Sequence, residues 1–218
     1  MSSADGGRGD EAWREAPVSR GTLRVTPHRR WGSRGGISRE RGSSYEEVFE
    51  EIADGAASES ELWASALLPG QRAAEPVFAT LLPEQRFALG VETIYEGYLL
   101  HYGRARLFAP TDDDVALLLG DALLAHGLVR IAGTGSLEAV ADLAKLLSLC
   151  AQARADGLPG DGPAWAATAA LLGRGGLGEA RDALRDRRDP ARLEALARQV
   201  AGGASVDAAL AAHERLVR

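Results

Sequence analysis

Clustered carboxylates between residues 109 and 121 are the first feature of this sequence with side chains suited to chemistry. The segment reads APTDDDVALLLGD, with an aspartate triplet at 112–114 and Asp121 two helical turns later. Carboxylates can hold a divalent cation, but they also stabilise the positive end of a helix. Thr111 and Asp114 have the spacing of a capping box, and no second acidic cluster offers further oxygen ligands. We therefore expect the triplet to begin a helix, and we predict no metal site.

Asp121 raises a separate question, because it lies inside the most apolar stretch of the chain. A buried carboxylate needs a hydrogen-bonding or charged partner. Arg104, Arg106 or His101 from the preceding segment could supply it. His101 and His126 are expected on adjacent antiparallel helices and could meet, but two histidines without a spaced third ligand are weak support for a metal site. We interpret both as packed histidines.

The elements that must position these side chains are helices. Apolar residues recur at helical spacing from residue 45 onward, and no stretch alternates with the period of a strand, so the sequence predicts an all-α domain over 45–218. Ser44 is expected to cap the first helix and Ser136 the sixth. The predicted helices span 45–55, 58–68, 72–82, 83–108, 111–133, 136–156, 163–173, 178–186, 190–201 and 206–217.

Two of these helices carry most of the candidate residues. The segment 111–133 is apolar almost all round, so we expect it to be a central helix buried on most sides. The segment 83–108 has one apolar stripe, which predicts a packed face. The stripe consists of Phe87, Val91, Ile94, Tyr98 and Tyr102.

Residues 1–44 differ from the rest of the chain. They are rich in glycine, serine and arginine, with nine arginines against five acids, and their apolar residues have no period. Such a segment buries too little surface to offset its ordering entropy, so we predict a disordered tail. Two interpretations stay open, a solvated leader or a basic arm around Trp31 that contacts an acidic partner.

Composition narrows the classes of protein. The net charge of −6 provides no whole-chain attraction to nucleic acid or to an anionic membrane. The single cysteine, Cys150, excludes an intramolecular disulfide and lies in an apolar helical pattern, so we expect a small buried side chain. No run reaches the roughly 18–20 apolar residues of a membrane span, and the polar N-terminus lacks the core of a secretory signal. We expect a cytoplasmic protein.

Three consecutive segments between residues 94 and 156 carry a family resemblance. TIYEGYLLHYGRARLF lies where the family has an aspartate-rich motif followed by paired arginines, LLLGDALLAHGLVRIA is similar to its central helix, and AVADLAKLLSLCAQARADG to the helix after that. The family is that of the trans-isoprenyl diphosphate synthases, or polyprenyl synthetases. The resemblance implies a bundle like part of the isoprenoid synthase fold. It also implies that an isoprenoid diphosphate could bind at Glu96, Arg104, Arg106 and Asp121.

The chain departs from the family pattern at the magnesium-binding motifs. Glu96, Gly97 and Leu100 stand where the first motif has its carboxylates, and nothing after Gly157 resembles the second. The resemblance therefore implies a subunit without catalysis or cofactor that partners or regulates an isoprenoid diphosphate synthase, through a homo- or hetero-oligomeric contact of helices 84–133.

Two alternatives come from other classes of protein. The chain could be an unrelated helical scaffold or interaction protein. It could also be a divergent prenyl transferase in which Asp112–Asp114, Asp121 and Glu96 bind magnesium.

Overall fold

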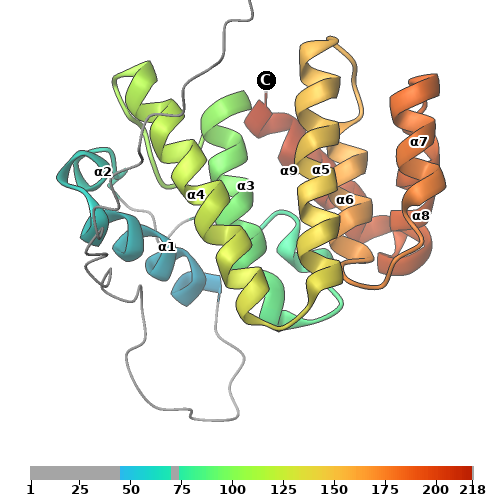
Figure 1. The fold of residues 1–218 in the computed structure, drawn as a ribbon, viewed down its shortest axis with the longest axis horizontal. Helices are drawn as coiled ribbons and strands as arrows, with labels where there is room; N and C mark the ends of the chain where they lie inside the picture. The colour runs from blue at the N-terminus through green and yellow to red at the C-terminus, as the bar shows by residue number, and fades with distance from the viewer. Residues whose placement is uncertain (1–44, 70–73, 218) are drawn as a thin grey trace, which may run out of the picture. The chain divides into compact units, whose positions relative to one another are not determined.

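The computed structural model describes residues 45–69 and 74–217, which belong to one compact unit within residues 34–218 (Figure 1). These residues form an all-α bundle without strands, apart from an isolated bridge between Leu67 and Phe108, so the predicted fold class is confirmed. The predicted tail at 1–44, with Trp31 and Ser44, lies outside the described residues. The helices are α1 (Tyr45–Glu59), α2 (Glu61–Ser65), α3 (Ala88–Tyr102), α4 (Asp113–Gly133), α5 (Leu137–Ala155), α6 (Asp161–Ala170), α7 (Gly178–Arg187), α8 (Ala191–Ala201) and α9 (Gly203–Val217).

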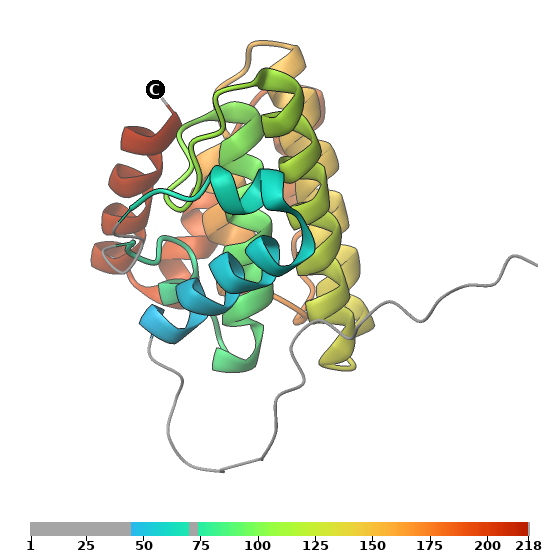
Figure 2. The ribbon, with the colours of Figure 1, turned by 90° about the vertical axis from the view of Figure 1, so that its left-hand side faces the viewer.

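Helix α3 is the central helix of the bundle. Nearly every residue from Ala88 to Leu99 is buried, including the polar side chains of Glu92 and Glu96. Helices α1, α4 and α9 all pack against α3, and α4 makes the most extensive contact (Figures 1 and 2). Glu96, the candidate site residue on this helix, is therefore presented to the protein interior, where its carboxylate needs a partner within the fold.

Helix α4 is buried on one side only, which corrects the prediction of a central helix. Its buried residues repeat at steps of three or four, whereas Leu118 and Val129 on the opposite side are exposed. The apolar run of α4 reflects a helix with one packed and one open apolar face. The buried residues are Leu119, Gly120, Leu123, Gly127 and Ile131.

Four glycines bring α3 and α4 close together. A Cβ atom added at Gly127 would lie 2.3 Å from Ile94 Cγ1 and 2.8 Å from the carbonyl oxygen of Gly90, and one added at Gly97 would lie 2.8 Å from the carbonyl oxygen of Gly120. The glycines lie seven residues apart in each helix, so they share one face. Small residues at these positions let the two antiparallel backbones touch, which a larger side chain would prevent.

An aromatic cluster joins α3 to α6, the second deeply buried helix. Trp165 of α6 packs edge-on against Tyr95 and Tyr98 of α3, with ring centroids 5.0 and 5.4 Å apart. Phe78 stacks on Trp165 at 5.5 Å. Because aromatic side chains bury large areas and prefer such offset or edge-on contacts, this cluster connects the two halves of the bundle.

Several predicted boundaries were wrong, and tertiary contacts explain why. The predicted helix 83–108 is helical only from Ala88, after a 3-10 turn, and ends at Tyr102. Beyond it, residues 107–109 pair in antiparallel fashion with residues 66–68, which follow α2. The expected helix 72–82 is a 3-10 turn over Ala79–Leu81, with residues 70–73 outside the described part. Helix α1 continues through Gly55, where the sequence predicted its end, and this glycine is buried in the bundle. The pairing of residues 107–109 with residues 66–68 joins positions far apart in the sequence, so no local pattern predicts it.

The glycine contact leads to a matched pair of substitutions in α4. We expect Gly127→Ala to destabilise the fold by about 1–3 kcal/mol, because the new methyl group would overlap Ile94 and the Gly90 backbone. Gly133→Ala places the same methyl group where nothing lies within 4 Å, so it should leave stability unchanged or raise it by up to about 1 kcal/mol. Urea unfolding followed by circular dichroism measures both, and equal effects would contradict the close helix contact.

Candidate functional site

Arg106 is the buried cation among the residues predicted to form a site, with a side chain that is only 6% exposed. Its Nη1 donates to Glu92 Oε2 at 2.6 Å and its Nε donates to Glu96 Oε2 at 3.0 Å. The guanidinium also lies 5.0 Å from the ring centroids of both Phe49 and Tyr95. Burial alone would lower the pKa of Arg106, but the two carboxylates outweigh it and raise the pKa above its usual value. Arg106 therefore stays charged inside the protein.

The two glutamates also bind backbone amides. Glu96 Oε1 accepts hydrogen bonds from the N–H groups of Arg106 at 2.7 Å and Leu107 at 2.6 Å, and Glu92 Oε1 accepts one from Ala79 at 3.1 Å. Each carboxylate thus ties α3 to a loop that precedes or follows it. We call Arg106, Glu92 and Glu96 the buried triad. Its members bind one another and the loops, while the buried Nη2 of Arg106 has no hydrogen-bond partner among the described residues. The structure thus brings Glu96 and Arg106 together as a structural pair.

A groove of about 590 Å³ adjoins the buried triad and holds the predicted residue Arg104 on its rim. Arg104 and Arg215 of α9 both line it, and neither side chain forms an ion pair with any described residue. The rest of the lining is mostly apolar, with Leu68, Val77 and Phe108 among its members. The predicted role of Arg104 and Arg106 in binding an isoprenoid diphosphate remains a prediction, and of the two only Arg104 has a free guanidinium.

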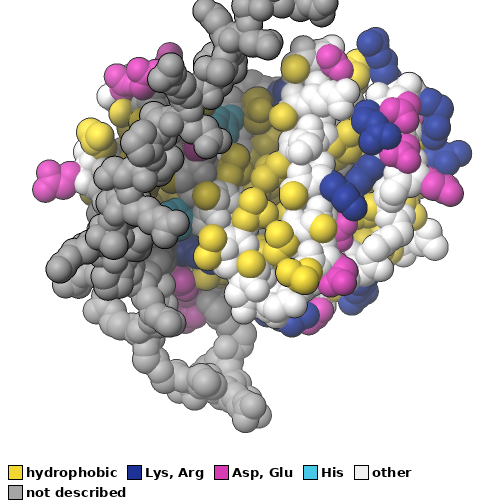
Figure 3. All heavy atoms as spheres, viewed as in Figure 1, with side chains coloured by type: hydrophobic (Ala, Val, Ile, Leu, Met, Phe, Trp, Pro, Cys, Tyr) yellow, Lys and Arg dark blue, Asp and Glu magenta, His cyan; other side chains and the backbone are white. Residues whose placement is uncertain are grey.

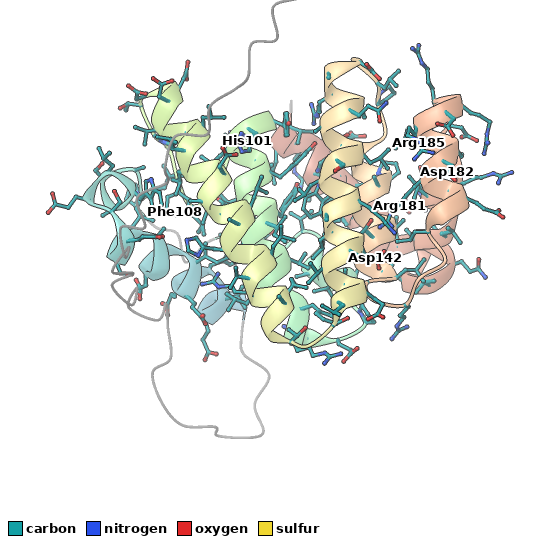
Figure 4. All side chains as sticks on the ribbon, in the orientation of Figure 1. His101, Phe108, Asp142, Arg181, Asp182 and Arg185 are labelled. Atoms are coloured by element: carbon teal, nitrogen blue, oxygen red, sulfur yellow. The ribbon has the colours of Figure 1, made fainter. Side chains whose placement is uncertain are left out.

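Asp121 lies on the outside of α4, not inside the bundle as predicted. Its side chain is 66% exposed, and its carboxylate oxygen Oδ1 is 3.2 Å from Nε2 of His101, one of the three partners proposed from the sequence (Figure 4). His126 pairs instead with Glu59 of α1 at 3.0 Å. Each histidine thus has a carboxylate partner on a neighbouring helix, and the two do not form a joint site.

The aspartate triplet caps α4, as predicted, although a different residue is the cap. Asp112 is the N-cap, and its Oδ1 accepts hydrogen bonds from the amides of Asp114 at 2.8 Å and Val115 at 3.2 Å. Thr111, the expected cap, precedes it. Asp113 and Asp114 occupy the first turn, where they favour the helix dipole. Among the described residues, no group of three or more His, Cys, Asp or Glu side chains could hold a metal ion.

A second polar network lies in the core between α3, α6 and α9, and the sequence did not indicate it. Asp161 accepts a hydrogen bond from Tyr98 at 2.5 Å, pairs with Arg154, and lies 3.4 Å from His213. Burial would raise the pKa of Asp161, but hydrogen bonds from His213 and Tyr98, together with the charge of Arg154, hold it well below its usual range. The residues are up to 115 positions apart in sequence, as Tyr98 and His213 are, so spacing carried no signal.

The remaining partners in this network are also buried. Tyr95 Oη lies 2.9 Å from His213 Nδ1, and burial raises the pKa of both Tyr95 and Tyr98 above the usual value for tyrosine. Cys150 is buried, as predicted, and burial raises the pKa of its thiol. None of these side chains lines a described groove, so the network holds helices together.

Comparisons with known proteins do not assign the chain to a family or a function. No protein-family model, no curated protein and no solved structure matches the chain.

Helix α4 is long and apolar enough to cross a membrane by length and composition, and 28% of its most apolar window is buried. Core helices of soluble proteins can meet the same criterion, so one such helix is weak evidence for a membrane span. The absence of a membrane span remains a prediction.

Removing the cation of the buried triad should destabilise the folded protein. We expect Arg106→Met to lower the free energy of unfolding by about 3–5 kcal/mol, because two buried carboxylates lose their counter-charge. Arg104→Met makes the same change at an exposed arginine without an ion pair, and should shift stability by no more than about 0.5 kcal/mol. Chemical unfolding of the two variants measures the difference, and comparable losses would contradict a structural role for the triad.

The network around Asp161 predicts acid sensitivity. Because the folded-state pKa of Asp161 is depressed, its charge contributes stability above the ordinary pKa of about 3.9, and that contribution is lost as pH falls further. We expect Asp161→Asn to cost about 1–3 kcal/mol at pH 6 and to flatten the decline of stability between pH 4 and 2. The exposed Asp156→Asn should retain the wild-type profile. Identical pH profiles for all three proteins would refute this assignment.

Proposed function

We propose that this chain is a non-catalytic helical subunit that binds a second protein through the outer face of α4. This face consists of Leu117, Leu118, Asp121, Ala125 and Val129, all of them exposed. It belongs to the region, residues 84–133, for which the sequence predicts a protein contact.

The observation that carries the proposal is the exposure of large apolar side chains on one helix. Leu117 is 53% exposed, Leu118 62% and Val129 69%. Figure 3 shows hydrophobic side chains gathered along α4 and the neighbouring α5, where Leu137 is also exposed. Burying one such side chain contributes about 1.5–3 kcal/mol, and contiguous apolar surface of this kind marks interaction sites.

The charge on α4 favours a particular kind of partner. Asp113 and Asp114 in the first turn, with Asp121, give the N-terminal half of the helix exposed negative charge. We therefore infer a protein with an apolar helix face flanked by basic residues. A second copy of this chain fits less well, because Arg130, the one arginine or lysine of α4, is engaged with Thr93 and Glu51. An anionic membrane would be repelled by the same aspartates.

The identity of the partner rests on the family resemblance. The Gly-Asp helix and the degenerate aspartate-rich motif at residues 96–100 point to an isoprenoid diphosphate synthase as the protein that α4 binds. The engagement of Glu96 and Arg106 in the buried triad supports a subunit without catalysis, because neither group is free to hold a magnesium-diphosphate.

Two exposed valines, one on α4 and one on α8, provide a test of the interface and its control. We expect the chain to co-purify with an isoprenoid diphosphate synthase from its own genome, and Val129→Asp to weaken that complex at least about tenfold, because a charge would enter an apolar contact. Val200→Asp makes the same change on α8, where valine is 43% exposed, and should bind normally. Light scattering and titration calorimetry measure complex mass and affinity.

Several outcomes would overturn the proposal. They are the absence of a complex with any such synthase, a complex insensitive to Val129→Asp, and a homodimer or vesicle binding that depends on Val129 in its place. Magnesium-dependent turnover of an allylic diphosphate by the purified chain alone would contradict the non-catalytic assignment and favour the prenyl transferase alternative.

A further inference from the structure

A groove between α5 and α7, lined by no residue of α4, has the lining of a ligand site. Its volume is about 540 Å³, within the range of small-molecule sites. One side is a face of α5 and the other is α7 with the glycine-rich loop before it. Figure 4 labels Asp142 of α5 and Arg181, Asp182 and Arg185 of α7, which border the groove, and Figure 3 shows Lys and Arg side chains interspersed with Asp and Glu over the same helices.

The base of this groove is a rigid, buried ion pair. Arg181 is 8% exposed and donates from Nη1 to Asp142 Oδ1 at 3.0 Å, and from Nη2 to the Asp142 carbonyl at 3.1 Å and Thr168 Oγ1 at 3.3 Å. Asp142 Oδ2 accepts the amide of Gly173 at 3.1 Å, which fixes the loop. The charge of Asp142 is thus fully engaged, while the buried Nε of Arg181 has no hydrogen-bond partner.

Two further features of the lining favour an anion. Lys145, the only lysine of the chain, lines the groove one helical turn after Asp142 and forms no ion pair within the described part of the protein. Helix α7 begins at Gly178 with no side-chain cap, so its first-turn amides have no partner within the helix. An added Cβ at Gly175, Gly176 or Gly178 would meet nothing within 4 Å, so these glycines border open space where α7 begins.

The other cations of the lining are held by aspartates. Arg185 pairs with Asp182 at 2.7 Å and with Asp186 at 2.9 Å, and Arg181 pairs with Asp142 at 3.0 Å. Lys145 is the lining cation that forms no ion pair within the described part of the protein. Several N–H donors and one ammonium group suit the multiple acceptor oxygens of a phosphate, while Ala144 and Leu149 offer apolar contact.

We propose that this groove binds a small organic phosphate, with the phosphate group between Lys145 and the first turn of α7 and the apolar part against Ala144 and Leu149. This site is independent of the α4 face and of any protein partner, so it stands or falls separately from the proposed function.

Titration calorimetry on the full chain tests the site with inorganic phosphate and phenyl phosphate as probes. We expect phenyl phosphate to bind more tightly than inorganic phosphate, and Lys145→Gln to weaken both at least about tenfold, the loss of one charge-assisted hydrogen bond. Lys145→Arg should retain most of the affinity. Arg215→Gln removes an unpaired cation from the other groove and should bind as the wild type does.

Each remaining outcome would overturn the proposal. Affinity lost equally in Lys145→Gln and Arg215→Gln would indicate unspecific attraction to cations. Affinity lost only in Arg215→Gln would place the anion in the groove beside Arg104. No binding by folded wild-type protein, or equal binding of the two probes, would remove the phosphate site or its apolar part. Circular dichroism checks that each variant is folded, which the exposed position of Lys145 favours.

Discussion

The ion pairing of Arg106 with Glu92 and Glu96 is the constraint on which the central helix depends. Two carboxylates on α3, one turn apart, would be untenable in the interior without a counter-charge. Arg106 supplies that charge from the loop after α3, and the glutamates in turn bind the amides of Ala79, Arg106 and Leu107. The loops before and after α3 are therefore held in place by the helix between them. The hydrogen bonds from the Arg106 and Leu107 amides to Glu96 fix the path of the chain after the helix ends at Tyr102.

With α3 held at the centre, α4 can pack on it from one side only. The glycines of the two helices bring their backbones into contact, and His101 meets Asp121 across the same interface. This accounts for both members of the Gly120-Asp121 pair, one as a point of close approach and the other as a partner of His101. It also leaves a face of leucine, valine and alanine uncovered within the described residues, which is why α4 is where we place a protein contact.

The two proposed surfaces would bind their partners through different interactions, apolar contact on one and attraction of an anion on the other. The outer face of α4 is apolar with acidic residues at one end, so it suits a helix of opposite charge. The groove between α5 and α7 has a fixed buried ion pair, an unpaired lysine and an open helix N-terminus, so it suits a small anion. The chain carries both on a core that relies on two buried polar networks, around Arg106 and around Asp161, for the relative placement of its helices.

Sequence alone determined the helical class, the cap at the aspartate triplet, the Ser136 cap, the burial of Cys150 and the pairing of Asp121 with one of three named partners. These follow from local periodicity and from hydrogen bonds within a helical turn. The seven-residue spacing of Gly90 and Gly97, and of Gly120 and Gly127, is a further local signal, because it places each pair on one face of its helix.

Only the tertiary structure decided which helix is central, because α3 and α4 are both apolar in sequence. The choice depends on whether Glu92 and Glu96 find a buried cation, and that cation, Arg106, lies on a loop whose path no local pattern predicts. The network of Tyr98, Asp161 and His213, and the meeting of Arg181 with Asp142, likewise join residues far apart in the chain. Such pairs form because burial requires every charge to be matched, and only the folded chain determines which groups are near enough to do so.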